Sequence, residues 1–419
     1  MLNVVAILLV LTAAFAYLNH RFLKWPTTIG VMAIAMVLSL AIAALEKFGY
    51  STLRNQEHAL LSSIDFTEVL MQGMLSLLLF AGALHVDVTA LRAYKWQVGV
   101  LALVGTAVST LLIGFGTWYV LGWVGLPLGL AYCLVFGALI SPTDPIAVLG
   151  ILKSAQVPKN LETMIAGESL LNDGVGVVLF ALLLTVVTQG RVPTVGEGLI
   201  LFAEEAGGGV LLGIVIGYVI YRLLRSIDHY QTEVLLTLAA VLGGYALANS
   251  IHVSGPLAMV VVGLFIGSRG RALAMSERTR THLDMFWELL DEILNGVLFV
   301  LIGLEVTLFE FPAHTLIAAA LIIGVTLAAR YLVVGLPVTL FRNAFRLPPG
   351  SGKVLTWGGV RGGISVALAL SIPPAPERDV VVVVTYCVVV FSILVQGLTI
   401  GRVARSVGRP ETAAVRHGH

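Results

Sequence analysis

Two carboxylates, Glu168 and Asp173, lie within one apolar stretch that is long enough to cross a membrane. The stretch runs from Thr163 to Val187, and residues 167–174 within it read Gly-Glu-Ser-Leu-Leu-Asn-Asp-Gly. An ionisable side chain at that depth is costly, and such residues mark ion paths, proton relays or buried ion pairs. The chemistry to consider is therefore the binding and release of cations and protons.

Helical spacing brings the polar residues of this stretch together. Residues four apart share a stripe, so Ser169 aligns with Asp173, and Glu168 aligns with Asn172 on a neighbouring stripe. Removal from water disfavours the charged form of a carboxylate, which lets a proton compete with a cation for it. We expect Asp173 to hold one or the other in turn. The alternative is a structural role, in which Asp173 only bonds neighbouring helices.

A second apolar stretch contains the run Ser-Pro-Thr-Asp-Pro at residues 141–145. Its two prolines remove backbone donors and disfavour a continuous helix, so we predict a break at Thr143. Such a break frees carbonyls and a helix end that can contact an ion. Backbone near Thr143 and the Asp144 carboxylate or its water would join Ser169 and Asp173 as oxygen ligands for a monovalent cation. We place Asn172 in the same predicted cation- and proton-binding set. The alternative is a proline kink, in which Asp144 caps the following half-helix.

A third stretch, residues 357–363, reads Trp-Gly-Gly-Val-Arg-Gly-Gly, and its glycines permit an unwound turn around Arg361. Two interrupted helices in different halves of the chain indicate a transporter built from inverted repeats, with its site near the membrane midplane. Because a buried charge needs a partner, we predict an ion pair between Glu168 and Arg361. Arg330 also lies within a span, and we expect it to bind a carbonyl at the end of a broken helix.

The composition places the chain in a membrane. Of its 419 residues, 58% are hydrophobic and 12% are charged, which is too apolar for a soluble core. We predict an all-α polytopic membrane protein with about 13 transmembrane helices, the first of them retained rather than removed as a signal peptide. The predicted spans are 2–18, 25–45, 67–86, 96–121, 125–150, 161–187, 198–224, 231–250, 253–268, 287–306, 313–341, 353–372 and 379–401.

Basic residues gather in alternate loops between these spans. Most of the 25 lysines and arginines lie in one set of loops, which includes Arg92, Lys95 and Lys159, whereas the opposite set carries few, such as Arg191. By the positive-inside rule, the N-terminus faces outward and the C-terminus faces the cytoplasm. We therefore expect a multi-pass protein of the inner (plasma) membrane of a bacterium.

The motifs resemble those of bacterial sodium/proton antiporters of the monovalent cation/proton antiporter superfamily, in the branch that includes the animal sodium/proton exchangers. The resemblance covers nearly the whole chain. It implies that Asp173 binds cation or proton, that Asp144 lies where two interrupted helices cross, and that Glu168 pairs with Arg361. The residues that carry the resemblance are 80–85, 143–145, 167–169, 172–173, 286–288, 303–304 and 358–362.

The same resemblance implies a stoichiometry and a domain organisation. Asn172 stands where electrogenic relatives carry a second aspartate, which implies electroneutral exchange of one cation for one proton. The family forms homodimers with a scaffold and a moving core. Mapped onto this chain, the scaffold comprises 1–94 and 191–310, the core comprises 95–190 and 311–403, and a short cytoplasmic tail comprises 404–419.

Some polar positions leave alternatives open. Ala81 departs from the family pattern, since many members carry a glutamate there, which puts the access route or the pH profile in question. Asp291, Glu292 and Asn295 open the span at 287–306 from the cytoplasmic side. They either attract cations or tune the response to pH, or they pair with the nearby arginines, Arg278 and Arg280.

Other functions compete with antiport. The predicted cation is Na+, with Li+ and K+ as alternatives, and a proton-coupled cation symporter or a channel is the nearest rival. An intramembrane aspartyl protease using Asp144 and Asp173 is the rival among enzymes. We expect no cofactor and no nucleic-acid partner. Cys133 and Cys387 are interpreted as packing residues, because no metal-ligand spacing surrounds them.

Overall fold

A computed structural model of the chain describes residues 2–46, 74–144, 148–150, 152, 157–190, 194–308 and 311–405. Helices account for nearly all of this part of the chain, and short turns join them. The span predicted at 67–86 is described only from residue 74 onward, and residues 406–419 of the predicted tail lie outside the described residues.

Each of the thirteen predicted spans contains at least one helix. In chain order the described helices are α1 (Leu2–Leu18), α2 (Thr27–Glu46), α5 (Leu75–Leu84), α6 (Val88–Ala93), α7 (Lys95–Val100), α8 (Thr106–Val124), α9 (Leu130–Ile140), α11 (Lys159–Gln189), α12 (Val195–Leu224), α13 (Tyr230–Ser250), α14 (Gly255–Phe265), α15 (Arg271–Leu273), α16 (Glu277–Leu304), α17 (Ala313–Arg330), α18 (Leu336–Leu340), α19 (Arg342–Phe345), α20 (Ser351–Trp357), α21 (Gly363–Leu370), α22 (Pro376–Phe391) and α23 (Leu398–Arg405). Short π-helical stretches continue several of them, at Asn19–Leu23, Leu101–Gly105, Ile266–Gly270, Tyr331–Gly335 and Ser392–Gly397, and a 3-10 turn, η5, follows α16 at Glu305–Leu308.

The lengths and composition of these helices suit a bilayer. Within the described residues, eight helical runs are long and apolar enough to cross a membrane, and Leu75–Leu84, Leu130–Ile140 and Gly255–Gly270 are shorter apolar helices. An isolated strand or loop cannot satisfy its backbone hydrogen bonds in hydrocarbon, whereas a helix satisfies them internally. The all-helical architecture therefore follows from the apolar composition.

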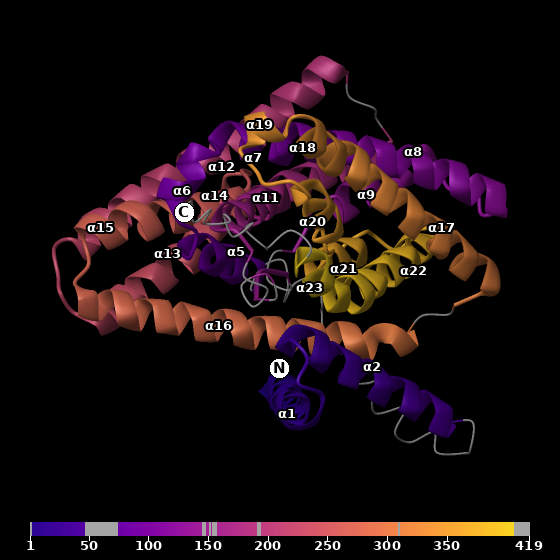
Figure 1. Cartoon of the computed structure of the whole chain (residues 1–419), viewed down its shortest axis with the longest axis horizontal. Coiled ribbons are helices and arrows are strands. Elements are labelled where there is room, and N and C mark those ends of the chain that lie inside the picture. The colour runs from indigo at the N-terminus through magenta and orange to yellow at the C-terminus, as the bar shows by residue number, and fades with distance from the viewer. Residues whose placement is uncertain are drawn as a thin grey trace, which may run out of the picture.

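The helices pack in two groups. One group consists of α8, α9, α11, α17, α21 and α22, which contact one another in the centre and right of the view (Figure 1). The other consists of α1, α2, α5, α12, α13, α14 and α16, in which α16 lies against α2 and α14 lies between α5 and α12. Helix α11 contacts both groups, through α9 on one side and through α14 on the other.

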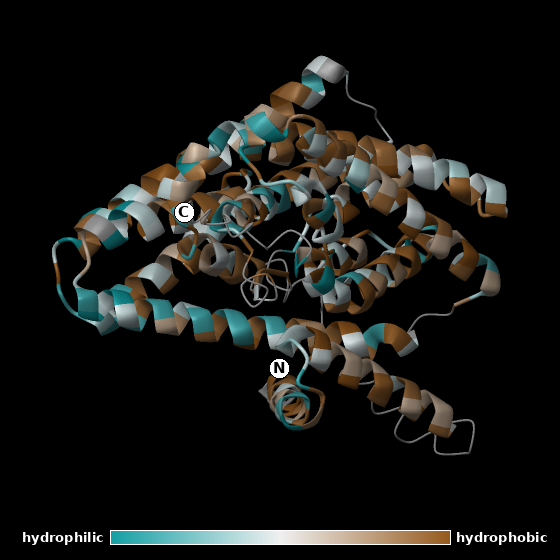
Figure 2. Ribbon diagram, in the orientation of Figure 1, coloured by the Kyte–Doolittle hydropathy of each residue, from teal (hydrophilic) through white to brown (hydrophobic). Residues whose placement is uncertain are grey.

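Helix α16 changes character along its length. It begins at Glu277, earlier than the span predicted at 287–306, because the Ser276 side chain caps it by accepting a hydrogen bond from the backbone of Thr279. Figure 2 shows a hydrophilic first half and a more hydrophobic second half. The second group of helices meets at Trp287, whose ring lies 4.5 Å from that of Phe80 and whose Nε1 donates to the Thr237 hydroxyl.

Candidate functional site

The first broken helix is present where the prolines predict it. Helix α9 ends at Ile140, and residues 141–144 are not helical. Helix resumes at residues 148–150, whereas Pro145 lies outside the described residues. The break therefore exposes the last carbonyls of α9, which have no partner within the helix.

The second broken helix crosses the first. Helix α20 ends at Trp357, residues 359–362 are not helical, and α21 begins at Gly363. The backbone N–H of Asp144 donates to the carbonyl of Val360 at 2.7 Å, so the two unwound segments bond to each other. Gly362 lies directly against the Asp144 carboxylate, so a Cβ at residue 362 would overlap with that carboxylate. Glycine is required here for close approach.

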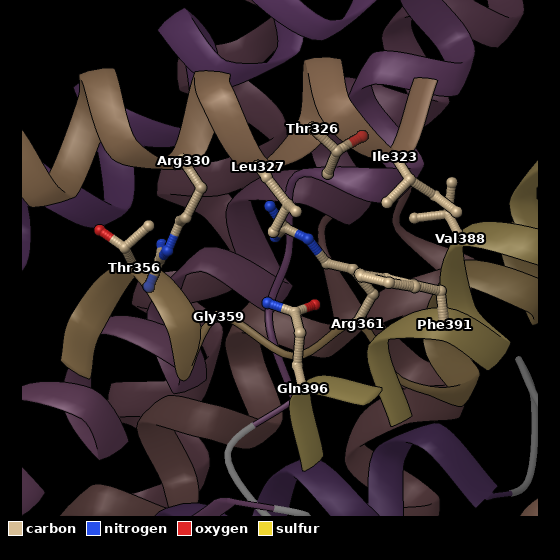
Figure 3. A pocket seen from close by; sticks show the side chains of 10 residues that line it. All are labelled: Ile323, Thr326, Leu327, Arg330, Thr356, Gly359, Arg361, Val388, Phe391 and Gln396. Atoms are coloured by element: carbon tan, nitrogen blue, oxygen red, sulfur yellow. The ribbon is translucent and has the colours of Figure 1, made fainter. Parts of the chain in front are cut away.

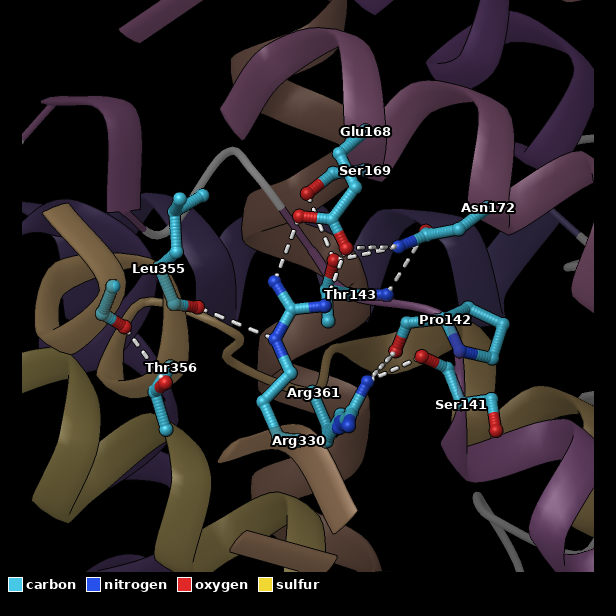
Figure 4. Close-up of polar contacts among 11 residues, drawn as sticks. Ser141, Pro142, Thr143, Glu168, Ser169, Asn172, Arg330, Leu355, Thr356 and Arg361 are labelled. Carbon is cyan, nitrogen blue, oxygen red and sulfur yellow. Dashed lines mark hydrogen bonds and ion pairs between the residues drawn. The ribbon is translucent and has the colours of Figure 1, made fainter. Parts of the chain in front are cut away.

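Helix α11 carries the four predicted polar residues past this crossing, and all four are buried. Asn172 bonds Thr143 twice, because its Oδ1 accepts from the Thr143 backbone at 3.2 Å and its Nδ2 donates to the Thr143 hydroxyl at 3.0 Å. That hydroxyl also lies 2.8 Å from the Ser169 hydroxyl (Figure 4). Residues 169 and 172 are thus fixed against the first break, as the helical spacing predicts.

Asp173 differs from its neighbours on α11. Its side chain is only 5% exposed, yet it forms no hydrogen bond or ion pair with any residue that the structure describes. The charges that act on it come from Asp144, Glu168 and Arg361. A buried carboxylate without a protein partner is expensive unless a proton or a cation neutralises it. The Asp173 carboxylate can therefore accept either a proton or a cation.

The predicted ion pair between Glu168 and Arg361 is wrong, because Arg330 takes the place of Arg361. Both guanidinium NH groups of Arg330 bond the Glu168 carboxylate, Nη2 to Oε2 at 2.8 Å and Nη1 to Oε1. The two side chains are 6% and 1% exposed. The Nε of Arg330 donates to the carbonyl of Leu355 at 3.2 Å, in the last turn of α20, which confirms the predicted contact with a broken helix.

Arg361 neutralises a helix end instead of a carboxylate. Its Nη1 donates to the carbonyls of Ser141 and Pro142, the second at 2.8 Å (Figure 4). These carbonyls follow the C-terminus of α9, where the helix dipole is negative. A buried arginine can donate hydrogen bonds either to a carboxylate or to carbonyls at a helix end. Helical spacing within one segment does not show which of these two acceptors lies closer to Arg361.

The two arginines lie side by side. They line a small cavity of about 10 Å³ together with Thr326, Thr356 and Gln396 (Figure 3). The close approach of Arg330 to residue 359 requires glycine there, since a Cβ on Gly359 would lie 2.5 Å from the Nε of Arg330. The sequence signal for the role of Arg330 was its position in the middle of an apolar span, which requires a partner of opposite charge.

A cleft borders the first half of α11, the helix that carries the site residues. It has a volume of about 460 Å³, and its walls come from α5, α6, α11 and α16. On α11 it extends to Leu170, which is three residues before Asp173. Polar side chains at its walls include His85, Asp87, Lys159, Glu162 and Asp291.

At the end of α16 away from the cleft, residues in and just beyond this helix contact α22. The Tyr386 hydroxyl on α22 donates to the Ile302 carbonyl on α16 at 2.7 Å, and its ring lies 6.3 Å from that of Phe311. Glu305, just beyond α16, is 5% exposed and interacts electrostatically with Arg378 on α22. We call this set of contacts the α16–α22 seal.

Crossed, unwound helices beside a helix with buried carboxylates define a polytopic transport protein of the membrane, in which backbone and side-chain oxygens can hold an ion. The chain matches the family model of the transmembrane sodium/hydrogen exchangers over residues 9–406, and it belongs to this family. The resemblance noted from the motifs is thereby confirmed. The chain is a multi-pass membrane transporter and not an enzyme, which sets the aspartyl protease aside.

Individual relatives agree with this assignment. The chain is 52% identical over 416 residues to the Na+/H+ antiporter NhaP of Pseudomonas aeruginosa, with 98% of each chain covered. It is 35% identical over 396 residues to the Na+/H+ antiporter NhaH of Halobacillus dabanensis, with 93% of each covered. Its fold is similar to that of the sodium proton antiporter MjNhaP1 from Methanocaldococcus jannaschii, with a TM-score of 0.75 and 20% identity over 98% of this chain and 99% of that one.

Proposed function

We propose that this chain exchanges Na+ for H+ across the membrane at a site centred on Asp173. The observation that carries the proposal is the buried Asp173 carboxylate, which bonds no described residue although Ser169, whose hydroxyl contacts that of Thr143, lies one turn before it on α11. Relatives over nearly the full length are named Na+/H+ antiporters, which supports this choice of ions. Thr143, Asp144 and Ser169 are the further oxygen donors that we assign to the cation.

The proposed exchange is electroneutral, with one Na+ for one H+. Asp173 can carry one proton or pair with one monovalent cation, so the charge that crosses is the same in both directions. Asn172 is neutral and is occupied with Thr143, so it adds no second titrating group. Glu168 is neutralised by Arg330 and serves to hold α11 against α17 and α20.

Exchange requires that the site opens to each side in turn. The cleft on one side and the α16–α22 seal on the other side support a state that is open to the cleft side alone. Lys159 lies at the cleft, in one of the predicted cytoplasmic loops, so we assign the cleft to the cytoplasm, with the N-terminus outside. In the opposite state the seal breaks and the cleft closes.

The two groups of helices supply the moving parts. We assign residues 95–190 and 311–403 to a mobile core and residues 1–94 and 191–310 to a scaffold that joins two copies in a homodimer. In support, α12 in the scaffold carries many exposed apolar side chains, among them Leu199, Leu211 and Val215. Movement of the core against a fixed scaffold would carry Asp173 between the two openings.

The direct test is Na+-driven proton movement in proteoliposomes whose membrane potential is clamped at zero. Exchange that persists under the clamp in the wild type and disappears in Asp173→Asn supports electroneutral antiport at Asp173. Persistent exchange in this variant would overturn the site, and exchange that stops under the clamp would overturn the stoichiometry. Parallel runs with Li+ and K+ rank the cations, and movement of Na+ and H+ in the same direction would establish symport instead.

A further inference from the structure

Several ionisable side chains line the cleft, and most of them form a hydrogen bond or lie at a helix end that favours their charge. Asp87 caps α6, because its Oδ1 accepts hydrogen bonds from the backbones of Thr89 and Ala90. Glu162 lies in the first turn of α11, where the helix dipole favours a negative charge. His85 bonds the carbonyl of Ala81 through Nδ1. Lys159 is the positively charged residue among those that line the cleft.

Asp291 on α16 has one carboxylate oxygen without such a partner, although the Asn295 side chain acts on its carboxylate. Its Oδ1 is buried from solvent and accepts no hydrogen bond from any residue that the structure describes. The Asn295 amide donates to the backbone carbonyl of Asp291 at 2.9 Å, which leaves this side-chain oxygen unbonded. Among the described residues Asp291 forms no ion pair, so pairing with Arg278 or Arg280, one of the alternatives drawn from the sequence, is absent.

The position of Asp291 relates it to the ion site. It lies on the wall of the cleft that also contains Ala166 and Leu170 of α11, and the charge of Asp144 acts on it. Leu170 precedes Asp173 by less than one helical turn, or about 4.5 Å along the axis. The cleft therefore brings a cation beside Asp291 and to within one helical turn of Asp173 along α11. Glu288 and Glu292, on the same helix, are exposed and do not line the cleft.

We propose that Asp291 attracts a hydrated monovalent cation into the cleft and passes it to Asp173. This inference deepens the proposed function, on which it rests. Its carboxylate raises the local concentration of cations without holding one permanently, because the cleft is wide. The role is one of access, so it affects the apparent affinity for Na+ from the cleft side and leaves the transport step itself unchanged.

The test compares Asp291→Asn with wild type in inverted membrane vesicles, in which the predicted cytoplasmic face meets the added Na+. At alkaline pH, where proton competition is weakest, the KM for Na+ should rise roughly three- to tenfold while the maximal rate stays within about twofold. The difference should shrink when choline chloride raises the ionic strength, because salt screens a charge acting at a distance. A purely structural defect would show neither the split between KM and rate nor the salt dependence.

Two further variants complete the experiment. Glu292→Gln removes an equal charge from the neighbouring exposed position, and its KM should match that of wild type. Thr163→Asp, introduced together with Asp291→Asn, returns a carboxylate to the wall of the same cleft and should restore much of the affinity. An unchanged KM in Asp291→Asn, a loss of rate alone, or a rise in KM that neither salt nor Thr163→Asp alters would overturn the proposal. A wild type without exchange would instead overturn the proposed antiport.

Discussion

The pair formed by Glu168 and Arg330 yields the sharpest structural prediction. Both side chains are more than nine-tenths buried and are joined by two hydrogen bonds. Removing one partner of such a pair leaves the other charge uncompensated, which costs about 3–5 kcal/mol. Arg330→Gln should therefore lower the free energy of unfolding by that amount. For a chain of this length, it corresponds to a decrease in Tm on the order of 5 °C.

A double-mutant cycle separates Arg330 from Arg361. Glu168→Gln combined with Arg330→Gln removes both charges, so its cost should fall short of the sum of the single variants by about 3 kcal/mol. Arg361 interacts with Glu168 through space but bonds the carbonyls of Ser141 and Pro142, so its coupling to Glu168 should be about 1 kcal/mol.

The assay is thermal unfolding of the purified protein in detergent, followed by tryptophan fluorescence, for the four members of each cycle. Coupling energies that are equal for the two arginines would refute the assignment, and so would a larger coupling with Arg361. Either result would favour the pairing of Glu168 with Arg361 that the sequence predicted.

Two more variants test the crossing and the seal. Gly362→Ala should abolish exchange in proteoliposomes while Tm changes little, because the added Cβ would displace the Asp144 carboxylate. Gly324→Ala, at a position with open space, is the control. Normal exchange in Gly362→Ala would contradict the close approach of Gly362 to Asp144. Tyr386→Phe removes the bond to the Ile302 carbonyl, so amide hydrogen exchange around Tyr386 in α22 and around Ile302 in α16 should accelerate. Rates equal to those of wild type would argue against a seal at this point.

Local rules account for what the sequence could predict. Apolar lengths located the spans, and the prolines around Thr143 located the first break, because both depend on residues next to each other in the chain. The spacing of Glu168, Ser169, Asn172 and Asp173 placed the polar groups correctly on α11 for the same reason. Each of these features is decided within one helix or one turn.

The partner of Glu168 depends on tertiary packing and was not predictable in this way. Arg330 and Arg361 are both buried arginines in the second half of the chain, and either could reach α11 in principle. The choice depends on how α17 and α20 are rotated against α11, which no spacing within a segment encodes. The free carbonyls of Ser141 and Pro142 offered a second acceptor for a guanidinium, and the sequence pattern did not rank it above a carboxylate.

Asp291 illustrates the same limit of local patterns. The sequence left its role open between cation attraction and pairing with an arginine. Only the arrangement of α5, α11 and α16 shows that this side chain lines the same cleft as Leu170. The role of a polar residue near the end of an apolar span depends on the helices that pack opposite it.

The central claim is that Na+ and H+ compete for the one carboxylate of Asp173. The most direct measurement is isothermal titration calorimetry of Na+ binding to the purified protein in buffers of different ionisation enthalpy, which reports how many protons leave as Na+ binds. At a pH where the site is mostly protonated, we predict about one proton released per Na+ in wild type, and neither binding nor release in Asp173→Asn. Sodium binding without proton release in wild type, or release that persists in Asp173→Asn, would contradict the account.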